Sequence, residues 1–82
     1  MDVIQQIRDK LHELDRPIAW LAKRIGVSRG CVDRILARQD RASGKTAAKI
    51  AAVLIQDATQ QAVMVAALVT LETHKNKERE RA

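Results

Sequence analysis

The sequence predicts an all-α protein, one compact domain of four or five short helices. Apolar residues recur at intervals of three and four through most of the chain, which is the period of an amphipathic helix. No segment alternates apolar and polar residues as a half-buried strand does. With 82 residues, the chain has room for a single hydrophobic core, which we assign to residues 1–71.

Residues 3–14 predict an amphipathic first helix. The residue before a proline disfavours the helical conformation, so this helix should end near Asp15. Pro17 then begins a second helix, where its missing N–H is harmless, and this helix extends to about Ile25. The apolar residues Val3, Ile4, Ile7, Leu11 and Leu14 lie at helical spacing along this segment, with polar residues between them.

Residues 18–37 carry the pattern of two short helices joined by a tight turn. Gly26 allows a left-handed turn at no steric cost, and Ser28 is a good cap for a third helix that runs to about Ala37. Apolar residues on both sides of the turn are spaced so that they lie on one face of a helix. They are Leu21, Ala22 and Ile25 before the turn, and Val32 and Ile35 after it. The pattern predicts a helix-turn-helix with one face of its second helix left free.

The residues Leu21-Ala22-x-x-Ile25-Gly26-Val27-Ser28-x-x-x-Val32-x-x-Ile35 resemble the Cro and lambda-repressor-like (Xre-type) DNA-binding family of phages, plasmids and bacteria. Outside this motif the resemblance is looser, and it extends over residues 2–55. It implies a lambda-repressor-like four- to five-helix domain whose third helix enters the major groove of DNA. Ile18 stands where many members carry a phosphate-binding glutamine, and Pro17 where a Ser or Thr cap is common, so no glutamine role is transferred.

The resemblance places the DNA base contacts on the outer side of the third helix. Arg29 and Arg34 suit bidentate contact with guanine, although both could contact phosphates instead. Asp33 could accept from cytosine or orient one of these arginines, and Gly30 could let the helix backbone approach DNA closely. The candidate base contacts are Ser28, Arg29, Gly30, Asp33 and Arg34.

Positive charge is concentrated around this motif. The chain has a net charge of +5, and residues 15–49 hold nine Lys or Arg against three acidic residues, a net +6. Such a segment suits the DNA backbone, although a solvated charge run is the alternative. Ser43 should cap a fourth helix after a basic loop at residues 38–43. The candidate phosphate contacts are Arg38, Arg41, Ser43 and Lys45.

A fifth helix, at about residues 57–74, predicts a homodimer. Residues 62–69 are apolar on every side, and a helix of that kind must be buried on every side. A second copy would cover what one small domain cannot, although the helix could instead lie within a monomer core. The candidate interface residues are Ala62, Val63, Val65, Ala66, Leu68 and Val69. The charged residues 72–82 should be a frayed or disordered tail.

These features favour a small dimeric transcriptional repressor, of phage or plasmid type, that binds a palindromic operator in double-stranded DNA. The alternatives are an antitoxin-type interaction protein with an unknown partner and a DNA-bending factor. We expect no enzyme, cofactor or metal, since no catalytic set is present and Cys31, the single cysteine, suits packing better than a redox role. Trp20 should be exposed on the second helix, where it could pack against the terminal helix or a second subunit, or stack on a DNA sugar–phosphate. We expect no secretory signal or membrane span, hence a cytoplasmic, nucleoid-associated bacterial protein.

Overall fold

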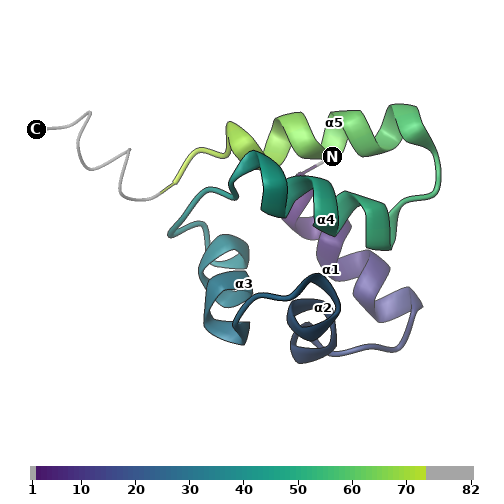
Figure 1. Cartoon of the computed structure of the whole chain (residues 1–82), viewed down its shortest axis with the longest axis vertical. Helices are drawn as coiled ribbons and strands as arrows, with labels where there is room; N and C mark the ends of the chain where they lie inside the picture. The colour runs from purple at the N-terminus through teal and green to yellow at the C-terminus, as the bar shows by residue number, and fades with distance from the viewer. Residues whose placement is uncertain (1, 74–82) are drawn as a thin grey trace, which may run out of the picture.

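The computed structural model describes residues 2–73, and this part of the chain contains five α-helices and no strand (Figure 1). The predicted all-α class is therefore confirmed. The helices are α1 (Val3–Glu13), α2 (Ile18–Ile25), α3 (Arg29–Leu36), α4 (Gly44–Leu54) and α5 (Ala58–Val69). No helix in the described range is both long and apolar enough to cross a membrane.

Four of the five helices begin with a side-chain cap. An oxygen of Asp2, Ser28, Ser43 or Asp57 accepts a hydrogen bond from a backbone N–H in the first turn of the helix that follows. The helix α2 differs, because Pro17 precedes it and supplies no side-chain hydrogen bond. A cap satisfies one of the backbone donors that a helix start leaves unpaired, so these four residues define where their helices begin.

Three of the helices are followed, within two residues of their last one, by a residue in the left-handed backbone conformation. These residues are Asp15 (φ 54°), Gly26 (φ 79°) and Arg38 (φ 61°). In each case the next N–H donates to a carbonyl five residues earlier, in the pairs Arg16–Leu11, Val27–Ala22 and Gln39–Arg34. This arrangement satisfies carbonyls at the helix end and turns the chain sharply. It also sets the directions of α2, α3 and α4 relative to the helices before them.

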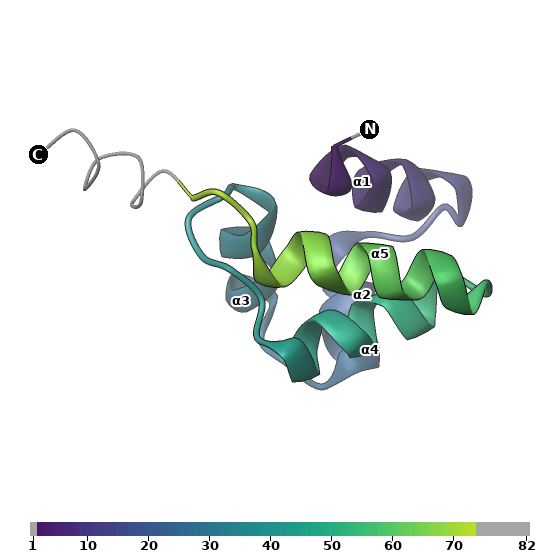
Figure 2. The same cartoon turned by 90° about the horizontal axis from the view of Figure 1, so that it is seen from above.

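The helix α4 lies at the centre of the molecule and packs against α1, α2 and α5. The helix α3 packs against α2. In Figure 1, α5 lies along the upper edge and α2 and α3 along the lower edge, and Figure 2 shows α5 in front of α2 from above. Every helix contributes to the core, whose largest fully buried side chains are Ile7, Leu21, Val32, Ile35, Ile50, Met64 and Leu68.

The structure corrects two expectations about α5. The helix ends at Val69 rather than running past Leu71, because the chain turns inward at Thr70 and buries Leu71 in the core. Leu68, expected in a dimer interface, is fully buried by the chain's own helices, so its side chain is not available to a partner. The rest of the expected helix, from residue 74 onward, and most of the expected charged tail lie outside the described residues.

We expect Gly26→Ala to lower the free energy of unfolding by about 1–2 kcal/mol, the usual cost of a left-handed conformation in a residue with a Cβ. No atom lies within 4 Å of the position that the new Cβ would take, so the cost arises from the backbone alone. Urea unfolding measures the change. The matched control is Gly44→Ala, whose new Cβ also has no atom within 4 Å. The backbone of Gly44 is not left-handed, so this variant should not destabilise the protein. Equal losses in both variants would contradict this account of the turn.

Candidate nucleic-acid interface

The five predicted base contacts lie together on the outer side of α3. Ser28, Arg29, Gly30 and Arg34 are exposed and Asp33 is half-buried, whereas Val32, Ile35 and Leu36 are buried on the inner side. We call the outer set, Ser28, Arg29, Gly30, Asp33 and Arg34, the α3 face. An eight-residue helix buried along one side in this way presents its other side as a fixed array of side chains.

Ser28 and Cys31 have structural roles at the start of α3. The Ser28 Oγ accepts from the Cys31 N–H at 3.2 Å, which leaves its hydroxyl hydrogen available as a donor. Cys31 is half-buried and packs against the core. A packing role for this thiol, as the sequence favoured, agrees with that position.

Arg29 and Asp33 form an ion pair on the α3 face. The Arg29 Nε lies 3.6 Å from the Asp33 Oδ2, and the side chains are 67% and 46% exposed. Asp33 therefore contacts Arg29, one of the arginines that the sequence suggested it could orient. Exposed pairs of this kind contribute at most about 1 kcal/mol, so a ligand can separate the two side chains at little cost.

Arg34 is held more closely, by a residue that the sequence analysis missed. Its Nε donates to the Asp40 Oδ2 at 2.9 Å, across the end of α3. Its Nη1 lies 3.6 Å from the position of a Cβ added at Gly30, so the guanidinium extends back over that glycine. A signal for Asp40 was present, because it is the only acidic residue between Asp33 and Asp57, in an otherwise basic loop.

The predicted phosphate contacts are more engaged with the protein than the sequence suggested. Arg38 is half-buried and forms an ion pair with Asp2 at the start of α1. The Arg41 Nε donates to the Leu71 carbonyl at 2.8 Å, which ties the loop before α4 to the chain after α5. The Ser43 Oγ accepts from the Thr46 N–H as a helix cap.

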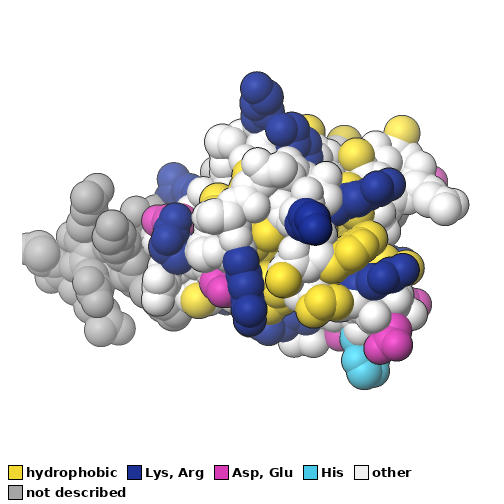
Figure 3. Space-filling model, turned by 60° about the horizontal axis from the view of Figure 1, so that its bottom comes forward, with side chains coloured by type: hydrophobic (Ala, Val, Ile, Leu, Met, Phe, Trp, Pro, Cys, Tyr) yellow, Lys and Arg dark blue, Asp and Glu magenta, His cyan; other side chains and the backbone are white. Residues whose placement is uncertain are grey.

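The starts of α2, α3 and α4 are electrostatically open to anions. None of these helices carries an acidic residue in its first turn, and the exposed Lys45 lies in the first turn of α4. Helix starts carry partial positive charge and bind phosphate groups. Figure 3 brings forward the side of Figure 1 where α2 and α3 lie, and shows Lys and Arg side chains spread across it with few acidic ones between them.

Trp20 is half-buried against the core rather than exposed, contrary to the expectation from the sequence. The Arg16 guanidinium lies 5.5 Å from the centre of its ring, within the range of a cation–π contact. The ring therefore has a partner within its own chain.

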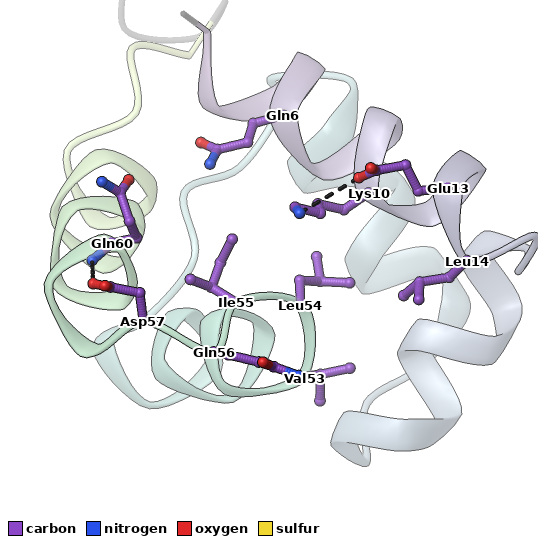
Figure 4. Close-up of a pocket in the computed structure, with 10 residues that line it drawn as sticks. All are labelled: Gln6, Lys10, Glu13, Leu14, Val53, Leu54, Ile55, Gln56, Asp57 and Gln60. Carbon is purple, nitrogen blue, oxygen red and sulfur yellow. Dashed lines mark hydrogen bonds and ion pairs between the residues drawn. The ribbon is translucent and has the colours of Figure 1, made fainter.

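A pocket of 540 Å³ lies away from the α3 face, between α1 and the α4–α5 connection (Figure 4). Its charged groups are already engaged, since Lys10 pairs with Glu13 at 3.4 Å and Asp57 caps α5. The residues around it are Gln6, Lys10, Glu13, Leu14, Val53, Leu54, Ile55, Gln56, Asp57 and Gln60. Within residues 2–73, no group of three or more His, Cys, Asp or Glu side chains is placed to hold a metal.

No family model matches this chain, and no curated protein or solved structure matches it either.

We expect Gly30→Ala to raise the free energy of unfolding by up to about 1 kcal/mol, because alanine favours a helix over glycine. A Cβ there meets the Arg34 Nη1 at 3.6 Å and the Ser28 Oγ at 4.0 Å, both ordinary contacts. Thermal unfolding of the two proteins measures the change. A less stable variant would show that the α3 face cannot accommodate a side chain at this position, and would contradict the prediction.

Proposed function

We propose that this chain is a sequence-specific DNA-binding transcriptional regulator, acting as a repressor. In this proposal α2, the turn at Gly26 and α3 form a helix-turn-helix, and α3 enters the major groove. The observation that carries it is the α3 face, where two exposed arginines flank a glycine on a helix packed against α2. Arginine is the side chain best suited to bidentate contact with guanine O6 and N7.

Gly30 suits this role because it leaves space between the two arginines. Without a side chain there, the backbone of α3 can approach the floor of the groove. The ion pair of Arg29 is solvent-exposed, so DNA can compete for this side chain, whereas Arg34 keeps its Nη1 near Gly30, outside its own ion pair. On this proposal the gain in stability expected for Gly30→Ala comes with weaker DNA binding.

The surroundings of the α3 face supply the attraction to the DNA backbone. The net positive charge of residues 15–49 includes the exposed Lys45 at the start of α4. Phosphate contacts of this kind fix the orientation of a protein on a duplex, whereas base contacts choose the sequence. A regulator bound in this way represses by covering a promoter.

We also propose that a second copy of the chain covers α5. Val63 is 58% exposed, Ala62 and Ala66 are exposed beside it, and Val65 and Val69 are half-buried. Exposed apolar side chains on successive turns are typical of surfaces that pair with another protein. In the antitoxin-type alternative, a different partner protein would cover these residues.

The position of α5 limits how such a pair could read DNA. The helix lies on the side of the molecule opposite α2 and α3 (Figures 1 and 2). A two-fold pair through its outward side would turn the two α3 faces away from each other. Binding of one palindrome by both subunits therefore requires pairing along an edge of α5, or through another surface. The DNA-reading role of α3 does not depend on which pairing occurs.

The DNA-binding proposal is tested with a duplex selected from a random library by the full chain. Arg34→Ala should weaken binding to this duplex by about 1–3 kcal/mol and to random DNA much less, because it removes a base contact.

Lys45→Ala should weaken binding to the selected duplex and to random DNA alike. It should also reduce the salt dependence of the affinity by about one phosphate contact per subunit. The logarithm of the binding constant should fall linearly with the logarithm of the salt concentration. For a pair of subunits making six to ten phosphate contacts, the slope of this line should be about −5 to −9.

The control for these variants is Lys10→Ala, which removes a positive charge at the pocket between α1 and the α4–α5 connection, away from α3. The affinity of Lys10→Ala for the selected duplex should stay close to that of the wild type. An affinity independent of salt, or failure to select any sequence, would refute the proposed function.

The pairing proposal predicts a dimer in sedimentation equilibrium at micromolar concentration. Val63→Glu should give folded monomers, because the side chain is exposed in the single chain but buried in the pair. Leu68→Glu should instead unfold the chain, since Leu68 is fully buried in the core. The control Ala52→Glu places the same charge on an exposed position of α4 and should leave the dimer intact. A monomeric wild type would rule out a second copy as the partner of α5.

A further inference from the structure

The contact between Arg34 and Asp40 differs from an ordinary surface ion pair. The loop after α3 reverses at Arg38, whose left-handed backbone turns the chain back toward the helix. The N–H groups of Gln39 and Asp40 then point to the Arg34 carbonyl, at 2.8 and 3.4 Å. The Asp40 carboxylate accepts from the Arg34 Nε at 2.9 Å. Asp40 is therefore held beside Arg34 through both its backbone and its side chain.

The hydrogen bond uses only one of the donor groups of Arg34. The Nε is directed to Asp40, whereas Nη1 extends over Gly30 on the α3 face. The two terminal nitrogens carry parallel N–H donors, which is the arrangement that matches guanine O6 and N7. An arginine held at Nε also loses less conformational freedom when its terminal nitrogens bind a base.

The negative charge of Asp40 works against contact with phosphates. A carboxylate 2.9 Å from the guanidinium offsets much of the charge that would otherwise attract Arg34 to the DNA backbone. Asp40 therefore weakens binding to every DNA sequence. It also increases the difference in affinity between DNA with the correct base pair and DNA with an incorrect one. Specificity of this kind depends on what weakens the incorrect complexes as much as on what stabilises the correct one.

We propose that Asp40 is a positioning residue that holds Arg34 over Gly30 with its terminal nitrogens free, and so directs it to a guanine rather than to a phosphate. This inference rests on the proposed DNA-binding function and deepens it. It assigns part of the sequence specificity to a loop residue outside the helix-turn-helix.

The chain offers a matched control in Gln39, the residue before Asp40. Its N–H also donates to the Arg34 carbonyl, but the side chain that accepts from the Arg34 guanidinium is that of Asp40. The variants Asp40→Ala and Gln39→Ala each shorten one side chain of the same loop, and neither residue is buried, which favours normal folding. Only the first removes the acceptor that holds Arg34, because alanine has no side-chain oxygen.

The experiment measures the affinity of the full chain for its selected duplex, for single base-pair variants of that duplex, and for random DNA. Arg34→Ala first identifies the base pair that Arg34 reads. At that pair, Asp40→Ala should reduce discrimination by about tenfold or more, since one bidentate contact supplies discrimination of that order. Gln39→Ala should leave it unchanged, and only Asp40→Ala should bind random DNA more tightly, because it removes a negative charge.

A second measurement requires no DNA. In the nuclear magnetic resonance spectrum of the free protein, the Nε–H of Arg34 should exchange with water more slowly than that of Arg29, and Asp40→Ala should remove the difference. Unchanged discrimination in Asp40→Ala, or no protection of the Arg34 Nε–H, overturns the inference and leaves the proposed function standing. If Arg34→Ala loses discrimination at no base pair, Arg34 reads no base and the inference is also wrong. If the wild type selects no sequence, the proposed function fails with it.

Discussion

The burial of one side of each short helix around α4 is the constraint on which the rest of the structure depends. Helices of eight residues, such as α2 and α3, do not persist alone in water, because their few internal hydrogen bonds do not offset the entropy of ordering the chain. Leu21, Ile35 and Ile50 are almost completely buried in the common core. The outward side chains of α3 therefore keep their positions only while the inward ones stay packed.

Around this core, most of the candidate DNA contacts also bind to the protein itself. Arg38 reaches Asp2, Arg41 reaches the Leu71 carbonyl, and Arg34 reaches Asp40. These contacts connect the basic loop after α3 with both ends of the described chain. If this surface binds DNA as proposed, it has a defined shape before DNA arrives, which lowers the conformational entropy lost on binding. Lys45, at the start of α4, can respond to the DNA backbone as a simple point charge.

The two proposed functional surfaces both depend on small residues. On the α3 face, a glycine between two arginines leaves room for a groove and for the Arg34 guanidinium. On α5, small apolar side chains such as Ala62 and Ala66 leave room for another helix to approach. Because α4 lies between these surfaces, a change on one reaches the other only through the core. We therefore expect DNA reading and pairing to be separable by mutation.

The sequence by itself determined the helices, most of the core and the outer residues of α3. Periodic apolar residues and caps such as Ser28 and Ser43 act within one or two helical turns, so their effects can be read along the chain. Only the tertiary structure decided that Leu68 belongs to the core, that the chain turns inward after Val69, and that Asp40 holds Arg34. These outcomes depend on how the helices pack and how the loop reverses at Arg38. Distances between separate elements are set by the whole fold, and no local pattern encodes them.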